Sequence, residues 1–230
     1  MAKQETAVVL LSGGQDSTTC LFWAKQRFEK VYALSVDYGQ RHKAELECAG
    51  RISASAGVEG HHVLTLEALG QIGDSDLVRE GTEIMSAGGY FDEVSNVTLP
   101  TSFVPGRNIL LLALCASYGA KVGARHLVTG VCQTDFSGYP DCREDFVQAM
   151  NEAINLGLPS SCRVQIHTPL MHLTKAETVK LAASLGDECM KALGESLTCY
   201  YGQRPGCGVC PSCALRAKGF AEAGIADPAL

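Results

Sequence analysis

The chain has 230 residues, of which 46% are hydrophobic and 19% are charged, and its formal net charge is −6 at pH 7. This composition is typical of a globular protein and excludes a largely disordered chain. The acidic balance argues against a surface made for nucleic acid. No apolar run approaches the ~20 residues that a membrane-spanning helix needs.

The N-terminal residues run directly into a strand-like segment and lack the charged, apolar and small-residue pattern of an export signal. We therefore expect a cytoplasmic protein with no membrane partner, in a compartment that keeps thiols reduced. Eleven cysteines are many for such a compartment. Seven of them are spread singly and are expected to be small buried residues rather than catalysts. These are Cys20, Cys48, Cys115, Cys132, Cys142, Cys162 and Cys189.

Apolar, β-branched runs alternate with helix-like segments along the chain. The runs predict five strands, within residues 6–12, 31–39, 61–67, 125–131 and 164–170. The segments between them predict helices within residues 16–28, 43–57, 109–124, 143–157 and 174–186. The alternation indicates an α/β fold, a Rossmann-like parallel five-stranded sheet with helices on both faces.

Three of these helices carry further local signals. The segment 109–124 is apolar on nearly all sides, so we expect it to be buried. Asp141 and Glu144, and likewise Thr174 and Glu177, have the spacing of a capping box. Gly186 is expected to end the last helix.

Residues 67–108 interrupt the alternation and are rich in Gly, Ser, Asp and Glu. A connection of this length in a compact domain is usually functional or mobile. Our hypothesis is that residues 67–104 close over a substrate as a lid.

The first strand is followed by Ser-Gly-Gly-Gln-Asp-Ser, residues 12–17. A glycine pair allows a sharp turn, and the loop amides with those of the next helix N-terminus form an anion site. The hydroxyls of Ser12, Ser17 and Thr18 add donors. Asp16 is unexpected beside an anion, unless it caps the helix or a magnesium ion lies between carboxylate and phosphate. The sequence lacks the lysine of G-x-x-x-x-G-K-[ST] and does not match G-x-G-x-x-G.

This loop resembles the pyrophosphate loop S-G-G-x-D-S of the ATP pyrophosphatase (PP-loop) superfamily, whose members hold ATP and transfer AMP to a substrate oxygen. Residues 36–42 follow the second strand, where the superfamily binds adenosine. Four further segments resemble the 7-cyano-7-deazaguanine synthase family in the right order. They are residues 103–108, 130–143, 168–177 and 198–220, and the likeness extends from Val8 to about Gly224.

The resemblance implies an adenine nucleotide alpha hydrolase-like domain over residues 1–190, with a zinc-binding segment, residues 191–230, packed on it. It implies magnesium and ATP as cofactors. The residues implied to bind ATP are Leu11, Ser12, Gly13, Gly14, Gln15, Asp16, Ser17, Thr18, Val36, Tyr38 and Gly130. The implied catalytic residues are Asp16, Ser17, Arg107 and Lys175.

The activity implied by the resemblance is an ATP-dependent ligase of queuosine biosynthesis. It would convert 7-carboxy-7-deazaguanine and ammonia to 7-cyano-7-deazaguanine through an adenylated acid and an adenylated amide. No amidotransferase domain is visible in the sequence, so we expect free ammonia as the nitrogen source. The resemblance also suggests a homodimer.

Two alternatives stay open at this stage. One is a PP-loop ligase or thiolase that modifies tRNA, and the scattered lysines and arginines of an acidic chain weigh against it. The other is a zinc-dependent binding module whose nucleotide loop has lost activity, and the complete loop weighs against that.

Four cysteines crowd into the C-terminal region with the spacing C-x7-C-x2-C-x2-C. Four thiolates complete a tetrahedral zinc site with no open position, which makes the site structural. Such a site would tie down a tail rich in Gly and Pro. An iron–sulfur cluster is the alternative, but here the proline follows the third cysteine and the fourth lies upstream, so zinc is favoured. The cysteines are Cys199, Cys207, Cys210 and Cys213.

The segment after the fourth strand lies where open α/β sheets bind ligands, at the carboxyl ends of the strands. A guanine-like base offers an N–H and an amino group to one carboxylate, and its face to an aromatic ring. Asp135 or Asp141 is the candidate acceptor, and Phe136 or Tyr139 is the candidate ring. The alternative is that Phe136 belongs to the core and Asp141 caps a helix.

Two cationic side chains complete the expected site. Arg107 follows Pro-Gly in the long connection and precedes a helix, where it could neutralise phosphate or the carboxylate of the substrate. Lys175 lies in the first turn of a helix, where a cation opposes the helix dipole. That placement suggests a ligand phosphate nearby.

Overall fold

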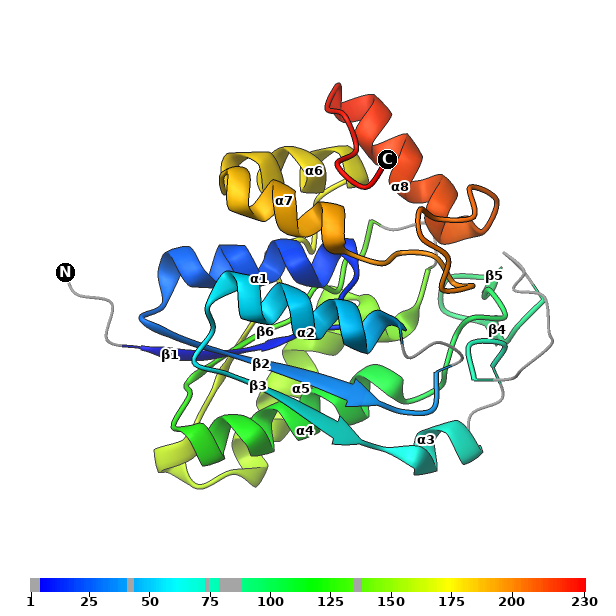
Figure 1. Ribbon diagram of the computed structural model, residues 1–230. Coiled ribbons are helices and arrows are strands. Elements are labelled where there is room, and N and C mark those ends of the chain that lie inside the picture. The colour runs from blue at the N-terminus through cyan, green and yellow to red at the C-terminus, as the bar shows by residue number, and fades with distance from the viewer. Residues whose placement is uncertain (1–4, 41–43, 73–74, 79–87, 135–137) are drawn as a thin grey trace.

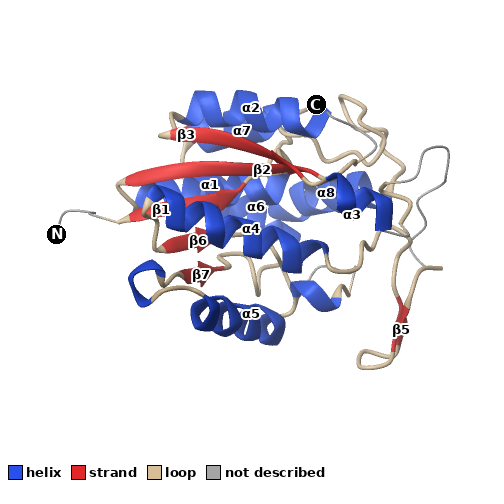
Figure 2. Cartoon of the chain, turned by 90° about the horizontal axis from the view of Figure 1, so that it is seen from below, coloured by secondary structure: helices blue, strands red, loops and turns tan. Residues whose placement is uncertain are grey.

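A computed structural model describes residues 5–40, 44–72, 75–78, 88–134 and 138–230 (Figure 1). At its centre is a parallel five-stranded sheet. Its strands are β1 (Thr6–Leu10), β2 (Lys30–Asp37), β3 (Gly60–Thr65), β6 (His126–Val128) and β7 (Gln165–His167). The order across the sheet is β3-β2-β1-β6-β7 (Figure 2). All five predicted strands are therefore confirmed.

Strand β1 lies in the middle of the sheet. Val8 pairs with Tyr32 of β2 on one side and with Leu127 of β6 on the other. Ala7, Val8 and Val9 have no exposed surface. A continuous apolar run of this kind is typical of a parallel strand that is covered on both faces.

Helices cover both faces of the sheet, as predicted (Figure 1). On one face lie α1 (Gln15–Arg27) and α2 (Ala44–Ala56), with α6 (Lys175–Ser184), α7 (Asp187–Glu195) and α8 (Pro211–Ala223) forming a further layer over them. On the other face lie α4 (Arg107–Val122) and α5 (Glu144–Gly157). Each face has its own hydrophobic core, and the cysteines of the C-terminal region share the first core with α1 and α2.

Several short elements were not predicted. They are α3 (Glu67–Ile72), the hairpin of β4 (Phe91–Asp92) and β5 (Val97–Thr98), the 3-10 turns η1 (Pro140–Cys142) and η2 (Ser160–Cys162), and helices α7 and α8. Helix α8 starts at Pro211, and the Cys210 sulfur accepts a hydrogen bond from the Cys213 N–H over 3.4 Å. A proline in the first turn is a helix-start signal. This start was not predicted, because the segment was interpreted from its cysteine spacing alone.

Helix α4 corrects the expectation of a helix buried all round. Leu112, Cys115 and Ala116 are buried on its inner side, whereas the Ile109 side chain on its outer side is 46% exposed. The inner side of α4 covers one face of the sheet, and its outer side faces solvent.

In the described residues no helix is long and apolar enough to cross a bilayer.

One of the two predicted capping boxes is present. The Thr174 hydroxyl accepts from the Glu177 N–H (3.3 Å), and the Glu177 carboxylate accepts from the Thr174 N–H (2.8 Å). Gly186 follows the end of this helix with a φ of 105°, as expected. The box at Asp141 is wrong, because Arg143 occupies the N-cap of α5 and Asp141 lies in the preceding 3-10 turn.

The singly spaced cysteines are mostly buried, as predicted. Five are buried, and Cys142 and Cys162 are half-buried. All of them are free thiols.

Candidate active site

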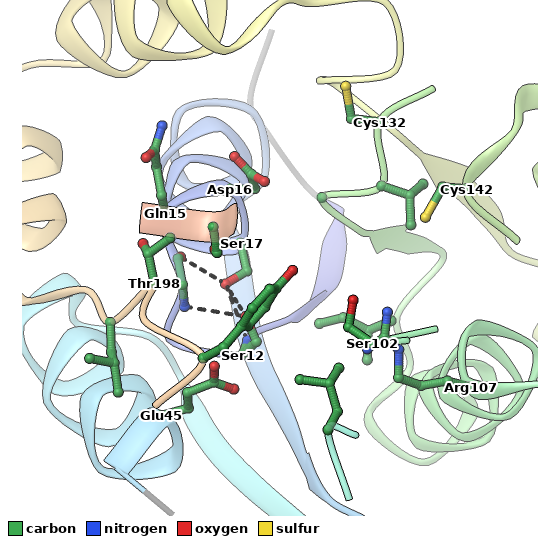
Figure 3. Close-up of a pocket in the computed structure, with 18 of the residues that line it drawn as sticks. Ser12, Gln15, Asp16, Ser17, Glu45, Ser102, Arg107, Cys132, Cys142 and Thr198 are labelled. Carbon is green, nitrogen blue, oxygen red and sulfur yellow. Dashed lines mark hydrogen bonds between the residues drawn. The ribbon is translucent and has the colours of Figure 1, made fainter. Parts of the chain in front are cut away.

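A cavity of about 650 Å³ opens at the carboxyl ends of β1, β2 and β6. Its lining comes from the chain segments that leave these strands and from α1, α2, α4, α6 and α8. Figure 3 shows part of this lining. The cavity brings together most of the residues predicted from the sequence. They are Leu11, Ser12, Gly14, Gln15, Asp16, Ser17, Val36, Tyr38, Arg107, Gly130, Tyr139 and Lys175.

The loop after β1 is held in shape by its own hydroxyl groups. The Ser17 hydroxyl accepts from the Ser12 N–H (3.2 Å) and lies 3.0 Å from the Ser12 hydroxyl, which accepts from the Gly14 N–H (3.2 Å). Ser17 and Thr18 both donate to the Gly14 carbonyl, over 3.1 and 2.8 Å. Thr18 is fully buried, so its hydroxyl stabilises the loop and does not line the cavity.

Two glycines allow other elements to pack closely on this loop. Gly13 has a φ of +88°, and a Cβ built there would lie 2.3 Å from the Glu45 carbonyl oxygen of α2. A Cβ on Gly130 would lie 3.2 Å from the Ser17 nitrogen at the start of α1. Both distances are shorter than ordinary contacts, so larger residues at either position would push the loop out of place.

Asp16, in the first turn of α1, forms an ion pair with Lys175, with 2.6 Å between the lysine Nζ and Asp16 Oδ2. Asp16 does not cap α1, because the N-cap is Gly14 and receives no side-chain hydrogen bond. Among the described residues, Asp16 Oδ1 is buried without a hydrogen-bond partner, and so is Gln15 Nε2. Carboxylate oxygens are among the ligands that Mg²⁺ prefers, so Asp16 could hold that ion.

Arg107 supplies a cation on the opposite side of the cavity (Figure 3). Burial lowers the pKa of its guanidinium, but nearby Tyr38 and Asp141 raise it by more, so the pKa lies above its usual value. Arg107 therefore remains charged inside the cavity.

Aromatic side chains line the same part of the cavity. The Tyr139 hydroxyl lies 2.6 Å from the Ser102 hydroxyl, and its ring packs on Phe103 with 5.3 Å between ring centroids. Tyr38 and Tyr200 line the cavity as well. Burial raises the pKa of all three tyrosines, so their hydroxyls stay protonated at neutral pH.

Asp141, one of the two candidate acceptors for the substrate base, does not line the cavity. Its carboxylate accepts from the backbone N–H of Asn108 (3.2 Å), and the Asn108 side chain donates to its carbonyl (3.1 Å). Asp141 thus holds the first turn of α4, which carries Arg107. The other candidates from this segment, Asp135 and Phe136, lie outside the described residues.

Glu45 and Tyr200 are among the cavity residues that were not predicted from the sequence. Glu45 lies in the first turn of α2, and burial raises the pKa of its carboxyl to about 7, with Arg107 lowering it in part. Tyr200 lies one residue after Cys199 in the C-terminal region. An acidic residue in a first helical turn is common, and a tyrosine in a Gly/Pro-rich tail has no periodic context, so neither carried a local signal.

The four clustered cysteines meet at one point. Their sulfurs all lie within 4.8 Å of one another, and those of Cys207 and Cys213 are 4.0 Å apart. Four sulfurs around a tetrahedral zinc at 2.3 Å would be about 3.8 Å apart. The Cys207 sulfur also accepts from the Cys210 N–H, over 3.3 Å. The donor set therefore fits a closed four-thiolate zinc site.

The comparisons with known proteins agree over almost the whole chain. The family model described as "Queuosine biosynthesis protein QueC" matches residues 6–224. The 7-cyano-7-deazaguanine synthase of Chromobacterium violaceum is 53% identical, covering 99% of this chain and 94% of that protein. The protein of the same name from Laribacter hongkongensis is 52% identical, covering 98% and 94%. The one from Bacillus subtilis is 47% identical, covering 96% and 95%.

Proposed function

The chain belongs to the family of queuosine biosynthesis protein QueC, and on this premise we propose that it is an ATP-dependent ligase that makes 7-cyano-7-deazaguanine. The substrates are 7-carboxy-7-deazaguanine, ammonia and ATP. The observation that carries the proposal is the cavity that joins the phosphate loop, the cations Arg107 and Lys175 and several tyrosines, in a chain with relatives of that name.

The chemistry explains why such a cavity is needed. The oxygen of a carboxylate leaves poorly, so it first attacks the α-phosphorus of ATP and displaces pyrophosphate. Ammonia then replaces AMP and gives the primary amide. The amide oxygen attacks a second ATP, and loss of AMP leaves the nitrile. Catalysis consists mainly of positioning and of stabilising negative charge.

The residues divide this work between two sides of the cavity. On the phosphate side, the amides of the loop at residues 12–17 and the start of α1 bind phosphate oxygens, and Lys175 neutralises charge. Leu11, Val36 and Tyr38 provide the wall for adenosine. On the other side, Arg107 binds the carboxylate of the deazapurine, and Tyr139 contacts its ring.

Two metal ions belong to the proposal. The free oxygen of Asp16 is a suitable ligand for Mg²⁺, which neutralises phosphate charge when bound. Zinc at the four cysteines would fix the C-terminal segment, residues 191–230, on the ATP-binding domain, residues 1–190. Metal analysis should find one zinc per chain, and bound iron would contradict this assignment.

The remaining features of the proposal concern the setting of the enzyme. We propose that it acts in the cytoplasm with free ammonia and forms a homodimer. Exposed apolar side chains on α4 and the β4–β5 hairpin, such as Ile109, Phe91 and Val94, are candidates for the contact. Light scattering tests the assembly, and a monomer at micromolar concentration would contradict it.

The direct test is turnover. Purified protein with zinc bound is incubated with Mg-ATP, ammonium and 7-carboxy-7-deazaguanine, and the base is followed by mass spectrometry. The proposal predicts the amide as a transient species, then the nitrile, with release of AMP. A folded, zinc-loaded protein that left the acid unchanged would contradict it.

A further inference from the structure

One carboxylate in the cavity has no role in the scheme above. Glu45 stands at the start of α2, and its backbone carbonyl packs against Gly13 of the phosphate loop. Figure 3 shows its side chain directed into the cavity below Ser12, and it is one of the cavity-lining residues. Among the described residues, its carboxylate makes no hydrogen bond or ion pair.

A second carboxylate is out of place in a cavity that binds phosphate, because it repels anions. Asp16 forms an ion pair with Lys175, whereas in the described part of the chain Glu45 forms no ion pair and is influenced by Arg107 only at longer range. A half-buried carboxylate without an ion pair is therefore better suited to a group that brings N–H bonds or positive charge.

The groups that face Glu45 come from four elements. Arg107 of α4 is the cation among them, Tyr38 follows β2, Tyr200 belongs to the C-terminal segment, and Cys48 lies on α2 itself. Burial raises the pKa of Glu45 to about 7, against the effect of Arg107. Such a carboxyl gains and loses protons readily at neutral pH.

The proposed reaction releases protons from nitrogen at four points. Ammonium must lose one before it can attack, and the nitrogen loses a second once the C–N bond has formed. The amide loses one as its oxygen bonds to phosphorus. The last leaves as the C–O bond to AMP breaks and the nitrile forms. The phosphate loop and its cations hold charge but accept no protons.

We propose that Glu45 is the proton acceptor for these nitrogen steps. The inference rests on the proposed function and assigns the site of ammonia activation within it. Glu45 takes a proton from ammonium, and the electron pair left on nitrogen forms the C–N bond. The acylated nitrogen is then cationic and strongly acidic, and it loses its extra proton to solvent as the C–O bond breaks and AMP departs, which leaves the neutral amide. The carboxyl returns its proton to solvent and then accepts an N–H proton of the amide in the second round.

The test separates oxygen activation from nitrogen attack in the Glu45→Gln enzyme. Acid-dependent exchange of pyrophosphate into ATP should stay within about 2-fold of wild type, whereas amide formation from ammonium should fall about 100-fold. Hydroxylamine is mostly unprotonated at neutral pH and needs no such base. Its reaction with the adenylated acid should therefore be retained. Glu45→Asp should restore part of the ammonium activity.

Glu47→Gln is the matched control, because Glu47 lies on the same turn of α2 and is exposed. It should leave all three reactions unchanged. In the wild type, amide formation should rise with pH through about 7, and Glu45→Gln should remove that rise.

Two results would overturn the inference. One is a Glu45→Gln enzyme that forms the amide from ammonium at the wild-type rate. The other is a raised KM for the acid or ATP in the exchange reaction with normal attack by ammonium, which would make Glu45 a binding residue. Absence of acid-dependent exchange in the wild-type enzyme would instead refute the proposed function.

Discussion

The two sides of the cavity are built in different ways. The phosphate side is six consecutive residues, 12–17, closed by hydrogen bonds between their own hydroxyls and amides. The rest of the lining collects single side chains from separate segments. They are Tyr38, Glu45, Arg107, Tyr139 and Tyr200. A site built from consecutive residues can be recognised as a sequence pattern. A site built from distant residues forms only when the sheet and its helices bring those segments together.

The largest expected effect lies on the phosphate side. Lys175→Ala removes the cation next to the loop and leaves Asp16 unpaired, so exchange of pyrophosphate into ATP should fall about 1000-fold. Lys180→Ala, on the exposed side of the same helix, is the control and should be near wild type. A Lys175→Ala enzyme with normal exchange would show that phosphate does not bind where the local pattern indicates.

Substitution of Arg107, on the opposite side, should change the KM for the acid rather than the exchange of pyrophosphate into ATP. Arg107→Met should raise the KM for the acid about 100-fold while the KM for ATP changes little, because a buried charged contact contributes about 3 kcal/mol. Arg107→Lys should recover part of the loss, since lysine keeps the charge without the planar fork. An equal rise in the KM for ATP would break the proposed division of the cavity.

The buried carboxyl of Glu45 should carry a pH-dependent cost in stability. Its folded-state pKa of about 7 lies above its usual value of 4.5, so the folded chain holds the proton more tightly. Stability is therefore lost as pH rises from 4.5 through 7, by up to about 3 kcal/mol.

Glu45→Gln should remove this cost. Its free energy of unfolding should match the wild type near pH 4 and exceed it by about 2–3 kcal/mol at pH 8, as measured by urea unfolding without ligands. Equal stability at both pH values would mean that the carboxylate is well solvated. A variant that is more stable and less active is expected for a residue kept for function.

The smallest expected effect concerns the wall of the cavity. Tyr139→Phe leaves the buried Ser102 hydroxyl without its partner at 2.6 Å, which should cost about 1–2 kcal/mol of stability. Activity should change only a few-fold, because the ring itself remains. Thermal unfolding and steady-state kinetics measure the two effects, and an inactive Tyr139→Phe enzyme would show that the hydroxyl itself takes part in the reaction.

The same contrast explains how much could be predicted from the sequence. The five strands were predicted correctly because each is a short contiguous apolar run, such as Ala7–Val9 with no exposed surface. The phosphate loop and the cysteine cluster were likewise visible, since each depends on spacing along a few residues.

Tertiary contacts decided what could not be predicted. The spacing of Asp141 and Glu144 equals that of Thr174 and Glu177, yet only the second pair forms a capping box. In the first, a 3-10 turn from Pro140 to Cys142 moves the start of α5 to Arg143 and leaves the carboxylate for Asn108. Glu45 and Tyr200 likewise line the cavity because tertiary packing brings their segments there.

The most direct test of the central claim follows the oxygen atoms of the substrate. 7-Carboxy-7-deazaguanine with both carboxylate oxygens replaced by ¹⁸O is converted with unlabelled Mg-ATP and ammonium, and the products are weighed by mass spectrometry. Two rounds of adenylation predict two AMP molecules for each nitrile, each carrying one ¹⁸O. Label in pyrophosphate, in phosphate or in water, with unlabelled AMP, would contradict the account.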